Sequence, residues 1–394
     1  MKTEIDVVVV GAGASGLMCA IEAAKRGRSV MILDHANKAG KKILMSGGGR
    51  CNFTNYTVEA DNFLSENVHF CKSALSRFTQ WDFLAMVQDA EIPFHEREHG
   101  QLFCNETARD ILNMLLGECY KAGVSIQLES AIKNIHKVGD TQFIVKTNKD
   151  EYCCESLVVA TGGLSIPKMG ATAFGYKLAE QFGIEVKSTK AGLVPFTWMQ
   201  KDKAQFELLS GLALPVRMSY LGHSFTENLL FTHRGLSGPV ALQISSYWQE
   251  GGLVGVDLLP EMDLQQALLQ AQVDKVKLKL SNYLSQFLAK KLVGLWLSKD
   301  ILDALVMDLS HKKIQEIAAE FNHWQFKPNG TEGYRTAEAT VGGVDCNAIS
   351  SKTFEAKQVP GLYFVGEVLD VTGWLGGYNF QWAWSSGWCA GQYV

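Results

Sequence analysis

The sequence VVVVGAGASG at residues 7–16 decides the fold, together with Asp34, which lies 18 residues after its last glycine. Four consecutive valines predict a buried strand, and the glycines match the G-x-G-x-x-G pattern that joins a strand to a helix in dinucleotide-binding folds. Gly11 permits the tight turn, and Gly13 lets the backbone approach a pyrophosphate whose charge the helix N-terminus stabilises. We therefore expect a dinucleotide-binding α/β unit, with Asp34 accepting hydrogen bonds from the ribose hydroxyls. The alternative is a chance glycine-rich turn in an unrelated α/β protein.

Three later segments point back to the same site and favour FAD over NAD. The strand predicted over residues 156–160 ends in Ala160-Thr161-Gly162-Gly163, a sequence by which many flavoproteins return to the cofactor. A strand over 361–365 is followed by Gly366-Glu367, whose acid would meet the ribityl chain or the pyrophosphate. Gly376-Gly377-Tyr378-Asn379 opens a last helix, and its N–H groups would face the flavin. A single NAD-binding unit would not explain three returns spread along the chain.

The sequence contains no second G-x-G-x-x-G motif, so we expect no separate nicotinamide domain. NAD(P)H stays a candidate electron donor that would use the open face of the flavin. No His or Cys stands in an evident attachment motif, so we expect the FAD to be non-covalent.

Composition excludes several classes of protein. The 394 residues carry 37 basic and 41 acidic side chains, and the net charge of −4 argues against a strongly basic nucleic-acid binder. No run of 18 apolar residues and no secretory signal is visible, so we expect a cytoplasmic protein without a membrane partner. Nine cysteines without a C-x-x-C pair disfavour a disulfide framework and a zinc site of common spacing, and we expect no metal.

Changes in sequence character predict three domains. An α/β domain would cover residues 1–190 and 346–394, and its segment 40–55 is polar enough to be a loop or an extended ligand-facing stretch. Short alternating segments over 191–262 and 324–345 predict an antiparallel sheet or barrel. Leucine spacing over 263–323 predicts a helical insert.

Three further motifs carry a family resemblance: KKILMSGGGRCNFTN at 41–55, FTHRGLSGP at 231–239 and NGTEGYRTAE at 329–338. Together with the tail from Gly361 to Gly387, they resemble the BaiN/RdsA (YhiN-like) family of NAD(P)/FAD-dependent oxidoreductases. The resemblance implies a Rossmann-like FAD-binding domain with a three-layer ββα architecture, an inserted β-barrel-like domain and a helical subdomain. Reactions linked to the family include reduction of uracil to dihydrouridine in ribosomal RNA, reductive steps of bile-acid dehydroxylation, and oxidation of small amines.

The motifs and the resemblance together give an expected set of cofactor contacts. They are Gly11, Gly13, Ala14, Ser15, Gly16, Asp34, Lys42, Ser46, Gly47, Gly48, Gly49, Arg50, Cys51, Asn52, Ile132, Ala160, Thr161, Gly162, Gly163, Gly366, Glu367, Gly376, Gly377, Tyr378 and Asn379.

Two residues are candidates for proton transfer. Cys51 lies in the glycine-rich segment, and a thiol beside a flavin can act as a general acid; the alternative is a small packed residue. His233 could bind or protonate substrate, and the alternative is a turn histidine that is merely hydrogen-bonded. Arg234, Glu332, Tyr334 and Arg335 are candidates for substrate binding, against an ordinary interdomain ion network.

The leading hypothesis is an FAD-dependent reductase of a carbon–carbon double bond that uses NAD(P)H. The preferred substrate is uridine in ribosomal RNA, and the lysines of the helical insert could contact RNA phosphates, although such surfaces are often only solvated. The alternatives are a small-molecule flavin oxidase or dehydrogenase with an amine or steroid-like substrate, and a non-catalytic FAD-bound redox protein.

Overall fold

The computed structural model describes residues 2–139 and 142–394, and it divides the chain into two compact units. The first unit consists of Met1–Ala191 and Glu338–Val394, and the second of Gly192–Ala337. Each unit is described by itself below. A separate helical subdomain within the second unit stays a prediction.

A five-stranded parallel sheet forms the centre of the first unit, in the order β22-β12-β2-β3-β8. Its strands are β2 Val7–Val10, β3 Val30–Leu33, β8 Ser125–Gln127, β12 Ser156–Val159 and β22 Leu362–Phe364. The chain moves outward from β2 to β3 and β8 on one side, and to β12 and β22 on the other. Strand β2 therefore ends where the strand order reverses, and ligands of open α/β sheets bind in the crevice at such a point.

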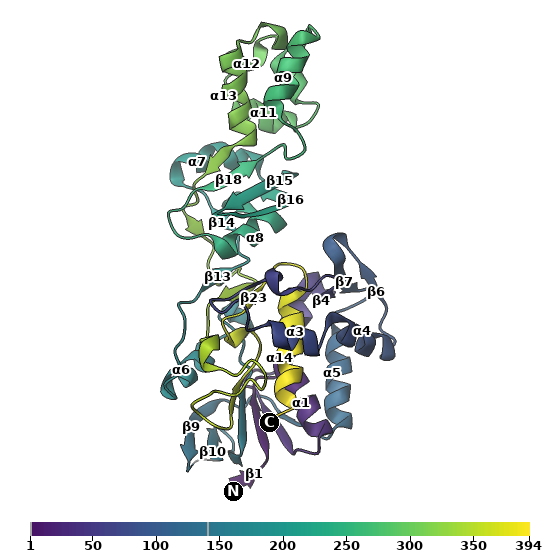
Figure 1. The fold of residues 1–394 in the computed structure, drawn as a ribbon, viewed down its shortest axis with the longest axis vertical. Coiled ribbons are helices and arrows are strands. Elements are labelled where there is room, and N and C mark those ends of the chain that lie inside the picture. The colour runs from purple at the N-terminus through teal and green to yellow at the C-terminus, as the bar shows by residue number, and fades with distance from the viewer. Residues whose placement is uncertain (1, 140–141) are drawn as a thin grey trace. The chain divides into compact units, whose positions relative to one another are not determined.

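Helices and a second sheet cover the two faces of this parallel sheet. The helices of the first unit are α1 Ala14–Lys25, α2 Lys41–Met45, α3 Lys72–Arg77, α4 Gln80–Asp89, α5 Arg109–Lys121, α6 Phe174–Gln181 and α14 Tyr378–Gly391. A four-stranded sheet runs β1-β11-β10-β9, with β1 Lys2–Glu4, β9 Ile132–Val138, β10 Gln142–Thr147 and β11 Glu151–Cys154. Figure 1 shows α1, α5 and α14 on one side and β9 and β10 on the other. This arrangement of two sheets and one layer of helices confirms the expected three-layer ββα architecture.

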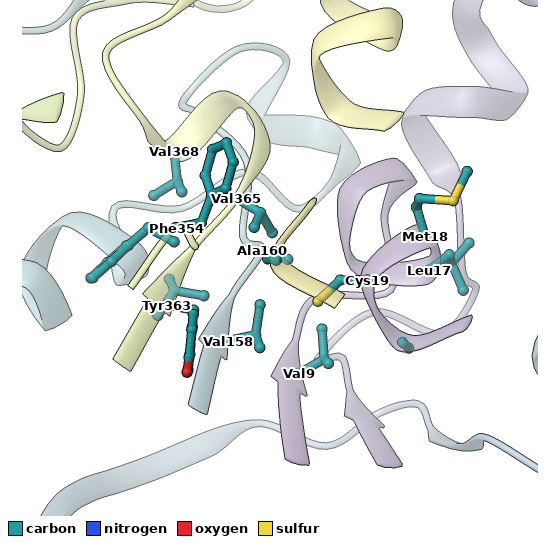
Figure 2. Close-up of a cluster of buried hydrophobic side chains, with 14 of the residues drawn as sticks. Val9, Leu17, Met18, Cys19, Val158, Ala160, Phe354, Tyr363, Val365 and Val368 are labelled. Carbon is teal, nitrogen blue, oxygen red and sulfur yellow. The ribbon is translucent and has the colours of Figure 1, made fainter. Parts of the chain in front are cut away.

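Helix α1 is buried almost all round, and not only along one face. It contacts β2 and β3 as well as the helices α5 and α14. Gly387 of α14 allows this approach, because a Cβ there would lie 2.4 Å from the Ser15 carbonyl oxygen. Figure 2 shows Leu17, Met18 and Cys19 of α1 near Val9 of β2, within one hydrophobic cluster.

The segment 40–55 is more ordered than the expected loop. It contains helix α2, a 3₁₀ turn at Ser46–Gly49 and strand β4 Asn52–Asn55. Strand β4 joins β7 Gln101–Cys104 and β6 Phe94–Glu96 in a three-stranded sheet. Short two-residue strands β5 Phe63–Leu64 and β23 Thr372–Gly373 also pair.

The second unit is built on a five-stranded antiparallel sheet in the order β17-β16-β15-β18-β19. The strands are β15 Ala213–Tyr220, β16 His223–Phe231, β17 Leu236–Ser237, β18 Val254–Asp257 and β19 Trp324–Phe326, and helix α8 Pro239–Tyr247 contacts β15 and β16. Strands β17 and β19 do not pair, so the sheet is an open half-barrel. Strands β14 Phe196–Thr197 and β20 Gly330–Thr331 and helix α7 Gln200–Phe206 complete this part.

The helical insert emerges between β18 and β19, which are neighbours in the sheet. Its helices are α9 Leu264–Val273, α10 Leu280–Leu284, α11 Lys290–Trp296, α12 Lys299–Asp303 and α13 His311–Asn322. The side chain of Asn322 ties it to the sheet by donating to Asp257 Oδ1 at 2.8 Å and accepting from Leu264 N at 3.0 Å. Among the described residues, no helix combines the length and apolar character needed to cross a lipid bilayer.

Candidate functional site: the glycine turn and its polar neighbours

The turn after β2 has one open glycine between two crowded ones. A Cβ on Gly11 would lie 2.4 Å from the carbonyl oxygen of Ala160, and a Cβ on Gly16 would lie 2.0 Å from that of Gly11. At Gly13 a Cβ would meet no protein atom within 4 Å. Internal packing therefore explains the first and third glycines, whereas the second faces space that a ligand can fill.

Asp34 lies at the carboxyl end of β3 and holds this turn in shape. Its Oδ2 accepts from the N–H of Ala12 and its Oδ1 from the N–H of Ala36, each at 2.8 Å. Each carboxylate oxygen has a second lone pair, so the expected bonds to ribose hydroxyls stay a prediction that these contacts permit.

A second open stretch lies in the three-glycine turn. Gly47, Gly48 and Gly49 have φ values of 56°, 66° and 88°, in a region of backbone conformation that residues with a Cβ rarely adopt. A Cβ would meet nothing within 4 Å at Gly48 or Gly49, whereas at Gly47 it would meet the ring of Phe103 at 2.8 Å. The exposed Arg50 follows directly. The turn therefore presents bare backbone to a ligand.

Lys42 and Glu367 form a polar cluster that joins segments far apart in the sequence. The Lys42 Nζ atom lies 2.6 Å from Glu367 Oε2 and donates to Ser165 Oγ at 2.7 Å. The other carboxylate oxygen, Oε1, accepts from Ser165 Oγ at 3.2 Å and from Thr340 N at 2.9 Å. The Thr340 Oγ1 atom in turn accepts from Leu164 N at 2.8 Å, next to Gly163. The cluster thus fixes α2, the loop after β12 and the turn after β22 together.

Ser165 and Thr340 are the members of this cluster that sequence reasoning missed. Neither stands in a recognisable motif. Only the fold brings them to Glu367, and the one available signal was that Ser165 lies two residues after the predicted Gly162-Gly163 return.

Strand β4 holds the glycine turn that opens α14. Asn55 Nδ2 donates to the Gly376 carbonyl oxygen at 2.9 Å, and with its amide turned over the Asn52 oxygen would accept from Gly377 N–H at 3.1 Å. Gly377 has a φ of 95°, and a Cβ there would lie 2.4 Å from Thr54 O. The Asn379 side chain closes the turn by accepting from Gly373 N at 2.8 Å. The turn and β4 are therefore one structural unit, as the predicted cofactor contacts at both require.

Cys51 is placed differently from our expectation. The residue is completely buried, and burial raises the pKa of its thiol to about 12. The thiol therefore packs inside the unit, and this burial argues against its predicted role as a general acid.

The other expected cofactor contacts surround the same turn with differing exposure. Gly366 packs on Ser15, since a Cβ on Gly366 would lie 2.5 Å from Ser15 Oγ. Ser46 Oγ donates to Ile43 O at 2.7 Å. Ala14, Ile132, Thr161 and Gly162 are half-buried, and Ala160, Gly163 and Tyr378 are buried.

The predicted substrate residues lie in the second unit. Thr232 Oγ1 accepts from Gly235 N at 3.0 Å and shapes a tight turn, at which His233 and Arg234 are exposed. Arg234 Nη1 lies 3.4 Å from Glu332 Oε2, so these two residues come together. Tyr334 is half-buried and Arg335 exposed.

The open glycines are the observation that tests whether FAD fits. Bare backbone at Gly13, Gly48 and Gly49 leaves a cradle that side chains would fill, at the point where a doubly wound sheet binds ligands. Arg50 and Lys42 supply positive charge beside it. The residues present therefore fit a dinucleotide.

Comparison with known proteins agrees. The model of the HI0933-like protein Rossmann domain family matches residues 5–393. The chain is 51% identical to a ribosomal RNA dihydrouridine synthase of Haemophilus influenzae over 98% of this chain and 97% of that protein. It is 51% identical to the protein of the same name from Escherichia coli K12, with the same coverage. A 3-dehydro-bile acid delta(4,6)-reductase of Clostridium scindens is 27% identical, again over 98% and 97%.

A solved structure supports the fold. A quinol-fumarate reductase with menaquinol superposes with a TM-score of 0.51 at 14% identity, over 100% of this chain and 71% of that chain. The parallel sheet, the glycine cradle and the matches over nearly all of the sequence lead to one conclusion: the chain belongs to the HI0933-like Rossmann-domain family and is an FAD-dependent oxidoreductase.

Proposed function

We propose that the protein reduces a uridine of ribosomal RNA to dihydrouridine, with NAD(P)H as the electron donor. The observation that carries this proposal is the 51% identity, over 98% of the chain, to two proteins named ribosomal RNA dihydrouridine synthase. A substrate in ribosomal RNA also fits the cytoplasmic location that we expect from the sequence.

The reaction adds a hydride and a proton across the C5=C6 bond of the uracil ring. FAD, when bound, supplies the hydride. The chain must hold the cofactor, exclude water and deliver the proton. The cluster of Lys42, Glu367, Ser165 and Thr340 fixes three loops around the cofactor cradle, so the cradle is formed before ligands arrive.

The proton needs a donor other than a buried thiol. His233 is exposed at its turn, and histidine is the side chain that most often transfers protons in enzymes. We therefore retain His233 as the candidate acid, with Arg234 and Glu332 as candidates for substrate contact.

The match to the bile-acid reductase favours a second candidate function, the reduction of a small unsaturated carbonyl compound. That reaction also saturates a carbon–carbon double bond, so both candidates share a reaction class. Because the identity to the bile-acid reductase is 27%, against 51% to the ribosomal RNA dihydrouridine synthase, we prefer ribosomal RNA as the substrate.

An anaerobic half-reaction separates these functions. The purified flavoprotein is reduced with NADPH or NADH, mixed with protein-free ribosomal RNA from a strain that lacks the gene, and followed at ~450 nm, where oxidised flavin absorbs. We expect reoxidation by this RNA, with dihydrouridine gained at one site. RNA from the parent strain, which already carries the modification, is the control and should leave the flavin reduced. If neither RNA reoxidises the reduced flavin, but air reoxidises it with release of hydrogen peroxide, the protein is an oxidase instead.

A further inference from the structure

The helical insert contains a segment with positive charge only. Between Lys275 and Lys299 the sequence has six lysines and no Asp or Glu, whereas outside it 31 basic residues face 41 acidic ones. The six lysines are all exposed. A chain with a net charge of −4 thus contains one stretch of 25 residues that carries six positive and no negative side chains.

The segment is folded, so the backbone positions of its lysines are fixed. Leu280, Leu284, Leu288 and Leu292 are buried in the core of the second unit and anchor α10 and α11. The stretch before α10 is also held, because Val306 N donates to Leu278 O at 3.0 Å and Leu280 N donates to Ala304 O at 2.9 Å. The lysines therefore project from an ordered surface and not from a disordered tail.

Most of these lysines have no acidic partner. Lys279 pairs with Asp303 at 2.9 Å, but Lys275, Lys277, Lys290 and Lys291 form no ion pair with any residue in the described ranges. Helix α13 of the same insert shows the ordinary alternative, a surface of mixed sign in which Lys313 pairs with Glu316 at 2.9 Å. The segment thus differs from a merely solvated helix face in its own neighbourhood.

Exposed apolar side chains accompany the lysines. Phe287 is 42% exposed and Leu278 is 38% exposed. An exposed aromatic ring among basic side chains suits a single-stranded nucleic acid, because phosphates meet the lysines while an unpaired base stacks on the ring.

We propose that this segment, which we call the lysine surface (Lys275–Lys299), binds the phosphate backbone of the ribosomal RNA substrate. The inference rests on the proposed function and adds where the RNA is held. The sequence-independent charge contacts would supply affinity, and the chemistry of the first unit would supply selection of the uridine.

The test uses the full-length holoenzyme and a quadruple variant, Lys275→Gln, Lys277→Gln, Lys290→Gln and Lys291→Gln. The matched control carries Lys72→Gln, Lys146→Gln, Lys177→Gln and Lys352→Gln, four exposed lysines of the first unit with the same change in charge. Binding of protein-free ribosomal RNA is measured against salt concentration, beside flavin content and NAD(P)H-driven reduction of ferricyanide.

We expect the quadruple variant to bind RNA at least ~10-fold more weakly near physiological salt, and the slope of log affinity against log salt to shrink by about 3. Flavin content and ferricyanide reduction should not change, and the control should bind like the parent. Phe287→Ala should weaken binding with an unchanged salt slope.

Two outcomes would overturn the inference, and they are distinguishable. If the parent forms dihydrouridine and the quadruple variant binds RNA as the control does, the lysine surface does not bind the RNA and the proposed function stands. If the parent reduces ferricyanide but neither binds nor modifies RNA, the proposed function fails and the lysine surface with it.

Discussion

Gly13 and Gly16 belong to one motif but serve different purposes. The backbone of Gly13, at φ −91° and ψ −171°, is accessible to any residue, so only a ligand requires a glycine there. Gly16 is required by the protein itself, because its Cα lies against the carbonyl of Gly11. The sequence motif alone cannot separate these two reasons.

Replacement of each glycine by alanine separates them. We expect Gly13→Ala to fold with the thermal stability of the flavin-free parent and to lose at least ~10-fold in flavin affinity, since the new methyl group occupies the pyrophosphate's approach. Gly16→Ala should lower the stability of the flavin-free protein itself by about 1–3 kcal/mol, because a Cβ would lie 2.0 Å from a backbone oxygen. Thermal unfolding and flavin absorbance per protein measure both. Full flavin content in Gly13→Ala would contradict the assignment of the cradle.

Cys51 gives a second prediction at the scale of a residue. Because the thiol is completely buried, Cys51→Ala should leave the rate of flavin reoxidation by RNA within about threefold and cost about 1–2 kcal/mol of stability. Cys104→Ala is the matched control, since Cys104 is equally buried and burial also raises its pKa to about 12. A loss of ~100-fold or more at Cys51 alone, with flavin retained, would restore it as the general acid.

The candidate site shows which residues sequence reasoning could find. Gly13 and Glu367 stand in short motifs beside predicted strands, where spacing carries the information. Thr340 stands in no such motif, and Ser165 has only its place two residues after Gly163, because their positions beside Glu367 depend on separate loops meeting in space. Burial of Cys51 was equally unpredictable, since a polar, glycine-rich sequence surrounds it.

At the scale of elements, strongly periodic segments were predictable and short ones were not. Strands β2, β12 and β22 and helices α1 and α14 follow from apolar runs and the glycine signals beside them. Helix α2 has only five residues and lies among glycines and lysines, so its sequence shows no helical periodicity from which it could be predicted. Strand β4 is likewise short, and its partners β6 and β7 supply its hydrogen bonds.

The contact between α1 and α14 depends on small residues of α14. Gly387→Ala should lower the free energy of unfolding by about 1–3 kcal/mol, because a Cβ would lie 2.4 Å from the Ser15 carbonyl oxygen and push the helices apart. Gly117→Ala in α5 is the matched control, since a Cβ there would meet nothing within 4 Å. It should stabilise the protein by about 0.5–1 kcal/mol through helix propensity. Chemical denaturation of both variants measures the difference, and equal behaviour would mean that the helices can separate without cost.

At the scale of the molecule, all nine cysteines are free and buried. Burial raises the pKa of Cys51, Cys104, Cys119 and Cys154 to about 12 and that of Cys71 and Cys389 to about 11, from an ordinary value of 9.0. A thiol whose pKa is raised by folding stabilises the folded state fully below pH 9. This contribution is lost as the pH rises toward 11–12, because the unfolded chain releases the proton first.

We therefore expect the melting temperature to fall steeply above pH 9 in reducing buffer. Thiol labelling at pH 8 should be slow for all nine cysteines and should follow global unfolding. The control is the same titration with Cys71→Ala and Cys389→Ala, in which the fall should be shallower. Rapid labelling of a cysteine in the native state would show that its burial is transient.

Strand β12 pairs with both β2 and β22, and α14 packs on α1, and these contacts also determine the order in which the protein can mature. Strand β2 is synthesised before β12 and β22, and its sheet lacks β22 and helix α1 lacks α14 until synthesis has passed residue 391. The second unit, by contrast, is continuous in sequence and is fully synthesised before β22. The lysine surface is thus synthesised before the cofactor cradle is complete, and a chain released early would carry the proposed RNA-binding charge without the complete cradle for FAD.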